Sequence, residues 1–232
     1  MIQGIAFDLE GTTVNVEPAH HWGWIRAASE IGVNLGTPTD ALEKVPNFSG
    51  GPDEEIIRQI YALAELQPSK AQASAFLERK WVHYEELIQT IDLRPRPGFF
   101  EAYGRFKCAG LPMTVGTAVE LERGLALLKR SGLDRFFSLH EIVMISDVQR
   151  SKPAPDCFLE TARRMKIDPK NQLIFEDSPR GVQAGIAAGS HVIAIPVYDT
   201  PIAHTRLREA GAKQIESEWG KVNVDALLLS FK

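Results

Sequence analysis

The chain has 232 residues, of which 44% are hydrophobic and 24% are charged, and its formal net charge is −4. This length and composition predict a globular protein with one sizeable core and room for a smaller inserted module. The mild negative charge gives no general basic field for a phosphate backbone, and no apolar stretch approaches the roughly 20 residues that span a bilayer. We therefore expect a cytoplasmic protein, a monomer or weak homodimer, that binds neither nucleic acid nor membranes.

The first predicted element is a buried strand at residues 2–7, and a long segment of different character follows it. Positions 16–92 carry helical patterns and no convincing strand. Two helices are predicted within this segment, at residues 54–66 and 71–91. The motif RPRPG then indicates a return to the main domain. We predict a helical cap over residues 16–92, inserted into an α/β core that comprises residues 1–15 and 93–232.

From residue 93 onward, short apolar runs alternate with longer amphipathic runs, which is the pattern of βα units that build a parallel sheet. Strands are predicted at residues 111–116, 142–145, 173–175 and 191–195. Helices are predicted at residues 119–131, 156–165 and 180–188. Together with the first strand, these units predict a doubly wound, mostly parallel sheet.

Polar residues follow four of the predicted strands. In open α/β sheets, reactive groups gather in the crevice beyond the carboxyl ends of the strands. Asp8 and Glu10, in FDLEGTTV, alternate along an extended segment and can face one ligand. The other three strands are followed by Thr117 and Ala118 in VGTAVE, by Lys152 in RSKPAPD, and by Glu176 and Asp177 in FEDSPRG.

These residue types point to phosphoryl chemistry. Converging carboxylates repel one another unless a cation joins them, and oxygen ligands suit Mg²⁺. The Thr117 hydroxyl and the amides that follow it, from Ala118, can hold an anionic oxygen at a helix start, and Lys152 can neutralise a transferring phosphoryl group. An ionised carboxylate such as Asp8 can attack phosphorus to give an acyl phosphate, which leaves Glu10 to handle a proton.

The four motifs, in this order, resemble those of the haloacid dehalogenase superfamily of aspartyl-phosphate hydrolases and mutases. The match runs through the whole chain, from DLEGTTV to FEDSPRG. The helical insert after the first motif resembles the cap of the subgroup that contains β-phosphoglucomutase and phosphoglycolate phosphatase. The resemblance implies a small phosphorylated metabolite as substrate and Mg²⁺ as cofactor.

The resemblance also implies roles for individual residues. Asp8 would be the nucleophile, and Glu10 would be the general acid and base. Thr117 and Lys152 would bind the phosphoryl group. The implied metal ligands are Asp8, the backbone carbonyl of Glu10, Asp177 and, directly or through water, Glu176.

Glu10 stands where this family usually has Asp. One extra methylene moves the carboxyl by about the length of a C–C bond, and misplacement by an ångström costs on the order of a hundredfold in rate. A carboxyl is nevertheless retained, which favours chemistry that must protonate a leaving oxygen. We therefore expect hydrolysis of a phosphate monoester. A phosphomutase acting on a sugar phosphate and a phosphate-ligand binding module without catalysis stay open as alternatives.

The predicted cap contributes candidates for substrate binding. His20 lies near the start of the first helix of the insert. In the resembling subgroup the loop that corresponds to NFSGGPDEE meets the substrate, so Phe48, Ser49 and Gly50 are specificity candidates. This loop contains no arginine that could bind the second phosphate group of a sugar-phosphate mutase substrate, which argues against a mutase. Arg180 stays open as an alternative residue for binding that second phosphate.

Overall fold

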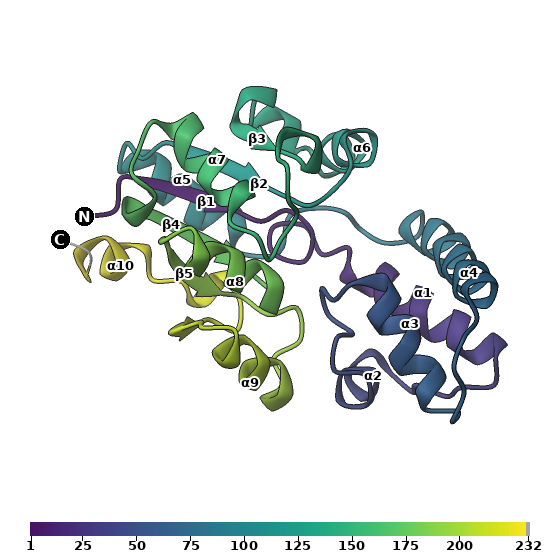
Figure 1. The fold of residues 1–232 in the computed structure, drawn as a ribbon. Helices are drawn as coiled ribbons and strands as arrows, with labels where there is room; N and C mark the ends of the chain where they lie inside the picture. The colour runs from purple at the N-terminus through teal and green to yellow at the C-terminus, as the bar shows by residue number, and fades with distance from the viewer. Residues whose placement is uncertain (231–232) are drawn as a thin grey trace. The chain divides into compact units, whose positions relative to one another are not determined.

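The computed structural model describes residues 1–230, and the chain divides into two compact units (Figure 1). The core unit comprises Met1–Asn15, Leu93–Asp199 and the described residues from His204 onward. The helical unit comprises Val16–Asp92 and Thr200–Ala203. No helix within residues 1–230 is both long and apolar enough to cross a membrane.

Within the described residues, the core unit is built on a six-stranded sheet in the order β3-β2-β1-β4-β5-β6, and all its strand pairs are parallel. The strands are β1 (Gly4–Phe7), β2 (Met113–Gly116), β3 (Ile142–Val143), β4 (Gln172–Glu176), β5 (His191–Ala194) and β6 (Gln214–Ile215). Because β1 lies between β2 and β4, the strand order reverses there. Open α/β sheets form their binding crevice at such a switch point. The predicted doubly wound parallel sheet is confirmed.

Helices alternate with strands along most of the core unit (Figure 1), and short 3₁₀ turns lie between them. The helices are α5 (Phe99–Cys108), α6 (Leu121–Ser131), α7 (Asp156–Met165), α8 (Pro179–Ala187), α9 (Pro201–Glu209) and α10 (Val224–Ser230). The 3₁₀ turns are η1 (Leu133–Arg135), η2 (Leu139–Glu141), η3 (Ile145–Asp147), η4 (Pro169–Asn171) and η5 (Trp219–Lys221). Helix α7 packs against β1, β2 and β3, and α8 packs against β4 and β5.

Every residue of the central strands β1, β2 and β4 is buried, which explains why their sequences are almost continuously apolar. An aromatic cluster lies around the end of β1. The Phe7 ring centroid lies 5.3 Å from that of Phe99, 5.8 Å from that of Phe175 and 5.8 Å from that of Trp219. This packing fixes the end of the strand from which the first acidic motif emerges.

The predicted elements from residue 93 onward agree with the structure to within two residues. The strand predicted at residues 142–145 ends at Val143. It ends early because the Asp147 carboxylate accepts a hydrogen bond from the Met144 amide at 2.8 Å, and the chain turns into η3. The sequence did not predict β6, α5, α9 or α10.

The helical unit contains α1 (Glu17–Glu30), α2 (Pro38–Lys44), α3 (Asp53–Ala62) and α4 (Lys70–Ile88), and no strand occurs among its described residues. Helix α1 packs against α4. The helix predicted from residue 71 begins at Lys70 because Ser69 and Gln72 form a reciprocal capping box. The helix predicted to reach residue 66 stops at Ala62, and Glu65 adopts a positive φ of 57° just beyond it.

The chain leaves and re-enters the core unit at neighbouring points. Val14 forms an antiparallel bridge with Pro95. The Arg96 amide donates a hydrogen bond to the Thr13 carbonyl at 2.8 Å. The segment between these residues therefore starts and finishes beside the loop that follows β1.

Candidate active site

The loop after β1 begins at Asp8, whose amide donates a hydrogen bond to the Phe175 carbonyl of β4 at 3.0 Å. On the other side of β1, Phe7 pairs with Val115 of β2. Parallel pairing in this register brings the residues after β1, β2 and β4 to the same edge of the sheet. Three of the predicted site residues, Asp8, Thr117 and Asp177, are in those positions and are buried.

Lys152 comes from the segment after η3 and reaches this edge. Its Nζ donates to Asp8 Oδ1 at 2.5 Å, to Glu176 Oε1 at 2.8 Å and to the Gly116 carbonyl at 3.1 Å. All three side chains are at most 9% exposed. We call Asp8, Lys152 and Glu176 the buried triad. Its single lysine is matched by two carboxylates.

Burial dominates the electrostatics of the triad. It raises the pKa of the Asp8 carboxyl to about 7, although the charge of Lys152 acts in the opposite direction. Burial alone would lower the pKa of Lys152, but the charges of Asp8 and Glu176 outweigh it, so the pKa of Lys152 lies above its usual value. Because buried charges of one sign repel, a further cation beside Asp8 would favour its ionised form.

Glu176, the last residue of β4, uses both carboxylate oxygens within the protein. Oε1 accepts from Lys152, and Oε2 accepts from the Ser178 amide at 2.7 Å and from the Ser178 hydroxyl at 3.0 Å. Arg180 holds the backbone of Lys152, because its guanidinium donates a hydrogen bond to the Lys152 carbonyl. In this geometry the Glu176 carboxylate holds Lys152, and its predicted role as a metal ligand, directly or through water, stays a prediction.

Gly181 has no side chain, and the Glu176 carboxylate occupies the space where a side chain at position 181 would lie. A Cβ at position 181 would lie 1.5 Å from Glu176 Oε1. We expect Gly181→Ala to push the carboxylate away from Lys152, to destabilise the fold by about 2 kcal/mol as overpacking does, and to lower turnover. Chemical denaturation and steady-state kinetics measure both effects.

Gly104 offers a matched control for Gly181, because a Cβ at this helical position of α5 would meet nothing within 4 Å. Gly104→Ala is expected to leave turnover unchanged and to stabilise the helix slightly. Equal stability and turnover in the two alanine variants would contradict the role assigned to Gly181.

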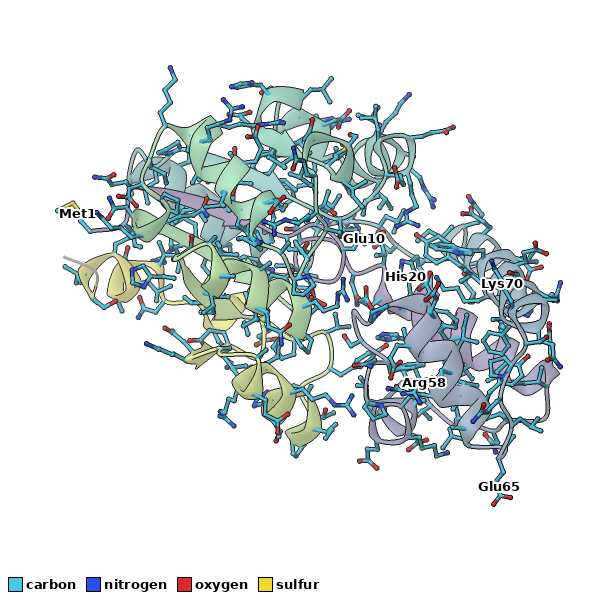
Figure 2. All side chains as sticks on the ribbon, in the orientation of Figure 1. Met1, Glu10, His20, Arg58, Glu65 and Lys70 are labelled. Carbon is cyan, nitrogen blue, oxygen red and sulfur yellow. The ribbon has the colours of Figure 1, made fainter. Side chains whose placement is uncertain are left out.

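The loop after β1 also holds Asp177. Thr12 Oγ1 donates to Asp177 Oδ1 at 2.8 Å. Gly11 has a φ of +83°, and a Cβ there would lie 2.3 Å from Asp177 Oδ2. Only glycine therefore allows the loop to pass so close to this carboxylate. Glu10 lies on the same loop (Figure 2), and its Oε2 is 3.5 Å from Nη2 of Arg123 in α6.

Two residues that sequence reasoning missed support this loop. Arg96 donates to the carbonyls of Gly11, at 2.8 Å, and Ile195, at 2.9 Å. Trp219 Nε1 donates to the Thr12 carbonyl at 2.9 Å. In the sequence, the motif RPRPG, which contains Arg96, indicates only a domain boundary. Trp219 lies far from every motif in sequence, so nothing local pointed to it.

Thr117 follows β2 and is 1% exposed, whereas Ala118 beside it is exposed. The Thr117 hydroxyl accepts a hydrogen bond from the Val119 amide at 3.3 Å. Helix α6 starts only at Leu121, with Glu120 as its N-cap residue, so Thr117 is not the cap of that helix. The hydroxyl thus organises a short turn between the strand and the helix.

The donor atoms in the loop after β1 and at Asp177 fit a magnesium ion. Among the described residues, no group of three or more His, Cys, Asp or Glu side chains forms a metal cage. Mg²⁺ commonly uses only one or two carboxylates, together with water and substrate phosphate. Asp8, Asp177 and the Glu10 carbonyl supply hard oxygen donors of this kind, while the Glu176 oxygens are held by Lys152 and Ser178.

The remaining site predictions fall in the helical unit. His20 lies in α1 (Figure 2), with its Nδ1 3.0 Å from Nζ of Lys80, a lysine that is 1% exposed. Phe48 is buried and stacks on His21, with ring centroids 4.7 Å apart, so its ring belongs to the interior of this unit. Ser49 is half-buried and Gly50 is exposed.

The structure defines an α/β protein with a parallel sheet and a buried charged cluster at its switch point, and sequence comparison names the family. The profile of the haloacid dehalogenase-like hydrolases matches residues 2–189. The chain therefore belongs to the haloacid dehalogenase-like hydrolase family, and the predicted family membership is confirmed.

Named relatives are similar over most of their length. Hexitol phosphatase A of Escherichia coli (strain K12) is 30% identical over 200 residues, which cover 86% of each chain. A fructose-1-phosphate phosphatase of the same organism is 29% identical over 195 residues, which cover 83% of this chain and 95% of the relative. These relatives support the prediction of a phosphatase.

Solved structures share the fold. A conserved haloacid dehalogenase-like protein of unknown function from Agrobacterium tumefaciens matches with a TM-score of 0.81 at 23% identity. The match covers 100% of this chain and 99% of that one.

Proposed function

We propose that the protein is a Mg²⁺-dependent phosphatase that hydrolyses a small phosphorylated metabolite through a phospho-Asp8 intermediate. The observation that carries the proposal is the buried triad at the switch point of the sheet, in which Lys152 contacts both Asp8 and Glu176. The hexitol and fructose phosphatases among the relatives favour a sugar or polyol phosphate as the substrate class.

In the first half-reaction, a carboxylate oxygen of Asp8 attacks the phosphorus atom, and the bond between phosphorus and the ester oxygen breaks. Glu10 donates a proton to the departing alkoxide. Lys152 and the Thr117 hydroxyl, with the amide of Ala118, stabilise the negative charge on the phosphoryl oxygens. The products of this step are the free alcohol and an acyl phosphate on Asp8.

In the second half-reaction, water attacks the phosphorus atom of phospho-Asp8. Glu10, now ionised, accepts a proton from that water, and the Asp8 carboxylate leaves. Inorganic phosphate is released, and both carboxyl groups return to their starting states. Glu176 takes no proton in this scheme, since it holds the Lys152 ammonium in place.

Asp8, Asp177 and the Glu10 carbonyl are proposed to hold the metal. A bound Mg²⁺ would orient the phosphate and offset its negative charge. It would also favour the ionised form of Asp8, whose pKa is raised chiefly by burial. His20, Ser49 and Gly50 of the helical unit, which we propose as a cap, stay candidates for choosing among substrates.

The proposed setting follows from charge and composition. A formal net charge of −4 argues against nucleic acid or an anionic membrane as a partner and is compatible with a small-molecule substrate. The location that we propose is the cytoplasm. The protein is proposed to act as a monomer or weak homodimer.

A substrate panel tests the function. It contains hexitol phosphates, ketose and aldose phosphates, phosphoglycolate and 4-nitrophenyl phosphate. We expect phosphate release with Mg²⁺, its loss in excess EDTA, and its return when Mg²⁺ is restored. Full activity in EDTA would contradict the metal. An isomerised sugar phosphate without free phosphate, or ligand-induced thermal stabilisation without turnover, would overturn the phosphatase assignment.

A further inference from the structure

Glu10 has a cationic neighbour that the proposed mechanism does not use. Arg123 lies in the first turn of α6, and its Nη2 is 3.5 Å from Glu10 Oε2. The Arg123 side chain is 31% exposed and the Glu10 side chain is 16% exposed, so the pair lies near the surface of the core unit and is only partly solvated. Both residues belong to the core unit, so the contact is internal to it.

The backbone around Arg123 is tied to the phosphoryl site. Helix α6 follows the turn that the Thr117 hydroxyl organises through the Val119 amide. The Glu120 carbonyl accepts a hydrogen bond from the Gly124 amide at 2.8 Å, which anchors the first turn of the helix. A shift of this turn would therefore move the backbone of Arg123 together with that of Thr117.

The reach of the side chain at position 10 decides whether this ion pair exists. Asp is shorter than Glu by one methylene, or about 1.5 Å. From the same backbone position, an Asp carboxylate would lie about that much farther from Arg123 and would lose ion-pair contact. Glu at this position is therefore matched to Arg123, which gives the unusual residue of the first motif a structural partner.

A partly exposed ion pair of this kind adds little to the stability of a fold. Its effect on a reacting group is different, because a carboxyl that must meet a leaving oxygen loses rate steeply when it is misplaced by an ångström. A long Glu side chain also has more rotamers than Asp to restrict. Arg123 provides a fixed charge that selects among these rotamers.

We propose that Arg123 is a positioning residue that aims the Glu10 carboxyl at the leaving oxygen, and that Glu10 and Arg123 act as a matched pair. This inference rests on the proposed acid–base role of Glu10. Arg123 itself contacts neither the phosphoryl group nor the metal in this assignment.

A double-mutant cycle tests the pair. The variants are Arg123→Gln, Arg123→Lys, Glu10→Gln, Glu10→Asp and the two combinations of Arg123→Gln with a Glu10 variant. Each is assayed with Mg²⁺ on the alkyl phosphate turned over fastest in the panel and on 4-nitrophenyl phosphate, whose leaving group departs without a proton. Thermal unfolding verifies that each variant is folded.

We expect Arg123→Gln to lower kcat on the alkyl phosphate about tenfold, with little change in KM and a smaller loss on 4-nitrophenyl phosphate. Arg123→Lys should recover part of the loss. In the Glu10→Gln and Glu10→Asp backgrounds, Arg123→Gln should add less than about a twofold effect. Lys129→Gln, which removes an exposed cation from the same helix, should change nothing.

Two failures are distinguishable. If Glu10→Gln lowers alkyl phosphate turnover and Arg123→Gln does not, or if Arg123→Gln acts equally in all backgrounds, the positioning role is overturned while the phosphatase function stands. If Glu10→Gln hydrolyses the alkyl phosphate at the unmutated rate, the acid–base role of Glu10 fails, and the positioning role fails with it.

Discussion

Asp8→Asn is expected to reduce phosphate release by at least about ten-thousandfold, because an amide cannot attack phosphorus and loss of a covalent nucleophile removes the whole pathway. The substitution keeps the shape of the side chain and an oxygen that can accept the hydrogen bond from Lys152. Steady-state phosphate release measures the loss. Rapid acid quenching with labelled substrate should trap a phosphorylated protein in the unmutated enzyme and none in the variant.

Asp134 supplies a matched control for this substitution, since it is an exposed aspartate of η1 in the same unit. Asp134→Asn should retain full turnover. A label that survives in Asp8→Asn would place the covalent intermediate on another residue. Turnover that survives without any label would mean that water attacks the substrate directly.

Lys152→Met is expected to affect stability and activity together. The substitution leaves the Asp8 and Glu176 carboxylates buried beside each other without the ammonium that now contacts both. Removing one partner of a buried ion pair costs about 3–5 kcal/mol. Turnover should fall by about a hundredfold to a thousandfold, as for the loss of a group that stabilises transition-state charge. Denaturation midpoints and kcat/KM report the two effects.

The double variant Lys152→Met/Glu176→Gln separates the two effects. Neutralising Glu176 removes one of the stranded charges, so stability should recover toward that of the unmutated protein. Turnover should stay low, since the ammonium group that stabilises charge on the phosphoryl oxygens is still missing. If activity recovered along with stability, Lys152 would be a structural partner of Glu176 and would have no catalytic role.

Much of the fold followed from the sequence because the parallel sheet is buried on both faces. Continuous apolar runs, such as that of β4, are separated by amphipathic helices, and helix α7 begins and ends at the predicted residues. Strand β6 was missed because it has only two half-buried residues and no apolar run. The early end of β3 depends on the Asp147 side chain, which a search for periodic patterns does not weigh.

Part of the candidate site could also be predicted from the sequence, and part could not. Asp8 and Asp177 directly follow strands that could be predicted, so their position at the same edge of the sheet could be predicted too. The partners of Glu176 and the contact between Glu10 and Arg123 depend on side-chain directions that spacing does not encode. Arg96 and Trp219 bind backbone carbonyls of the loop after β1 from distant parts of the chain, and no local pattern announces such contacts.

The bridge between Val14 and Pro95 has a consequence for how such a protein diversifies. Val14 and Pro95 flank the segment from Val16 to Asp92, and the bridge between them holds the two ends of this segment close together. The entropy of closing a loop grows only slowly with its length. A longer, shorter or unrelated inserted segment can therefore replace this one between Val14 and Pro95, while β1 keeps its register with β2 and β4 and Asp8 keeps its place.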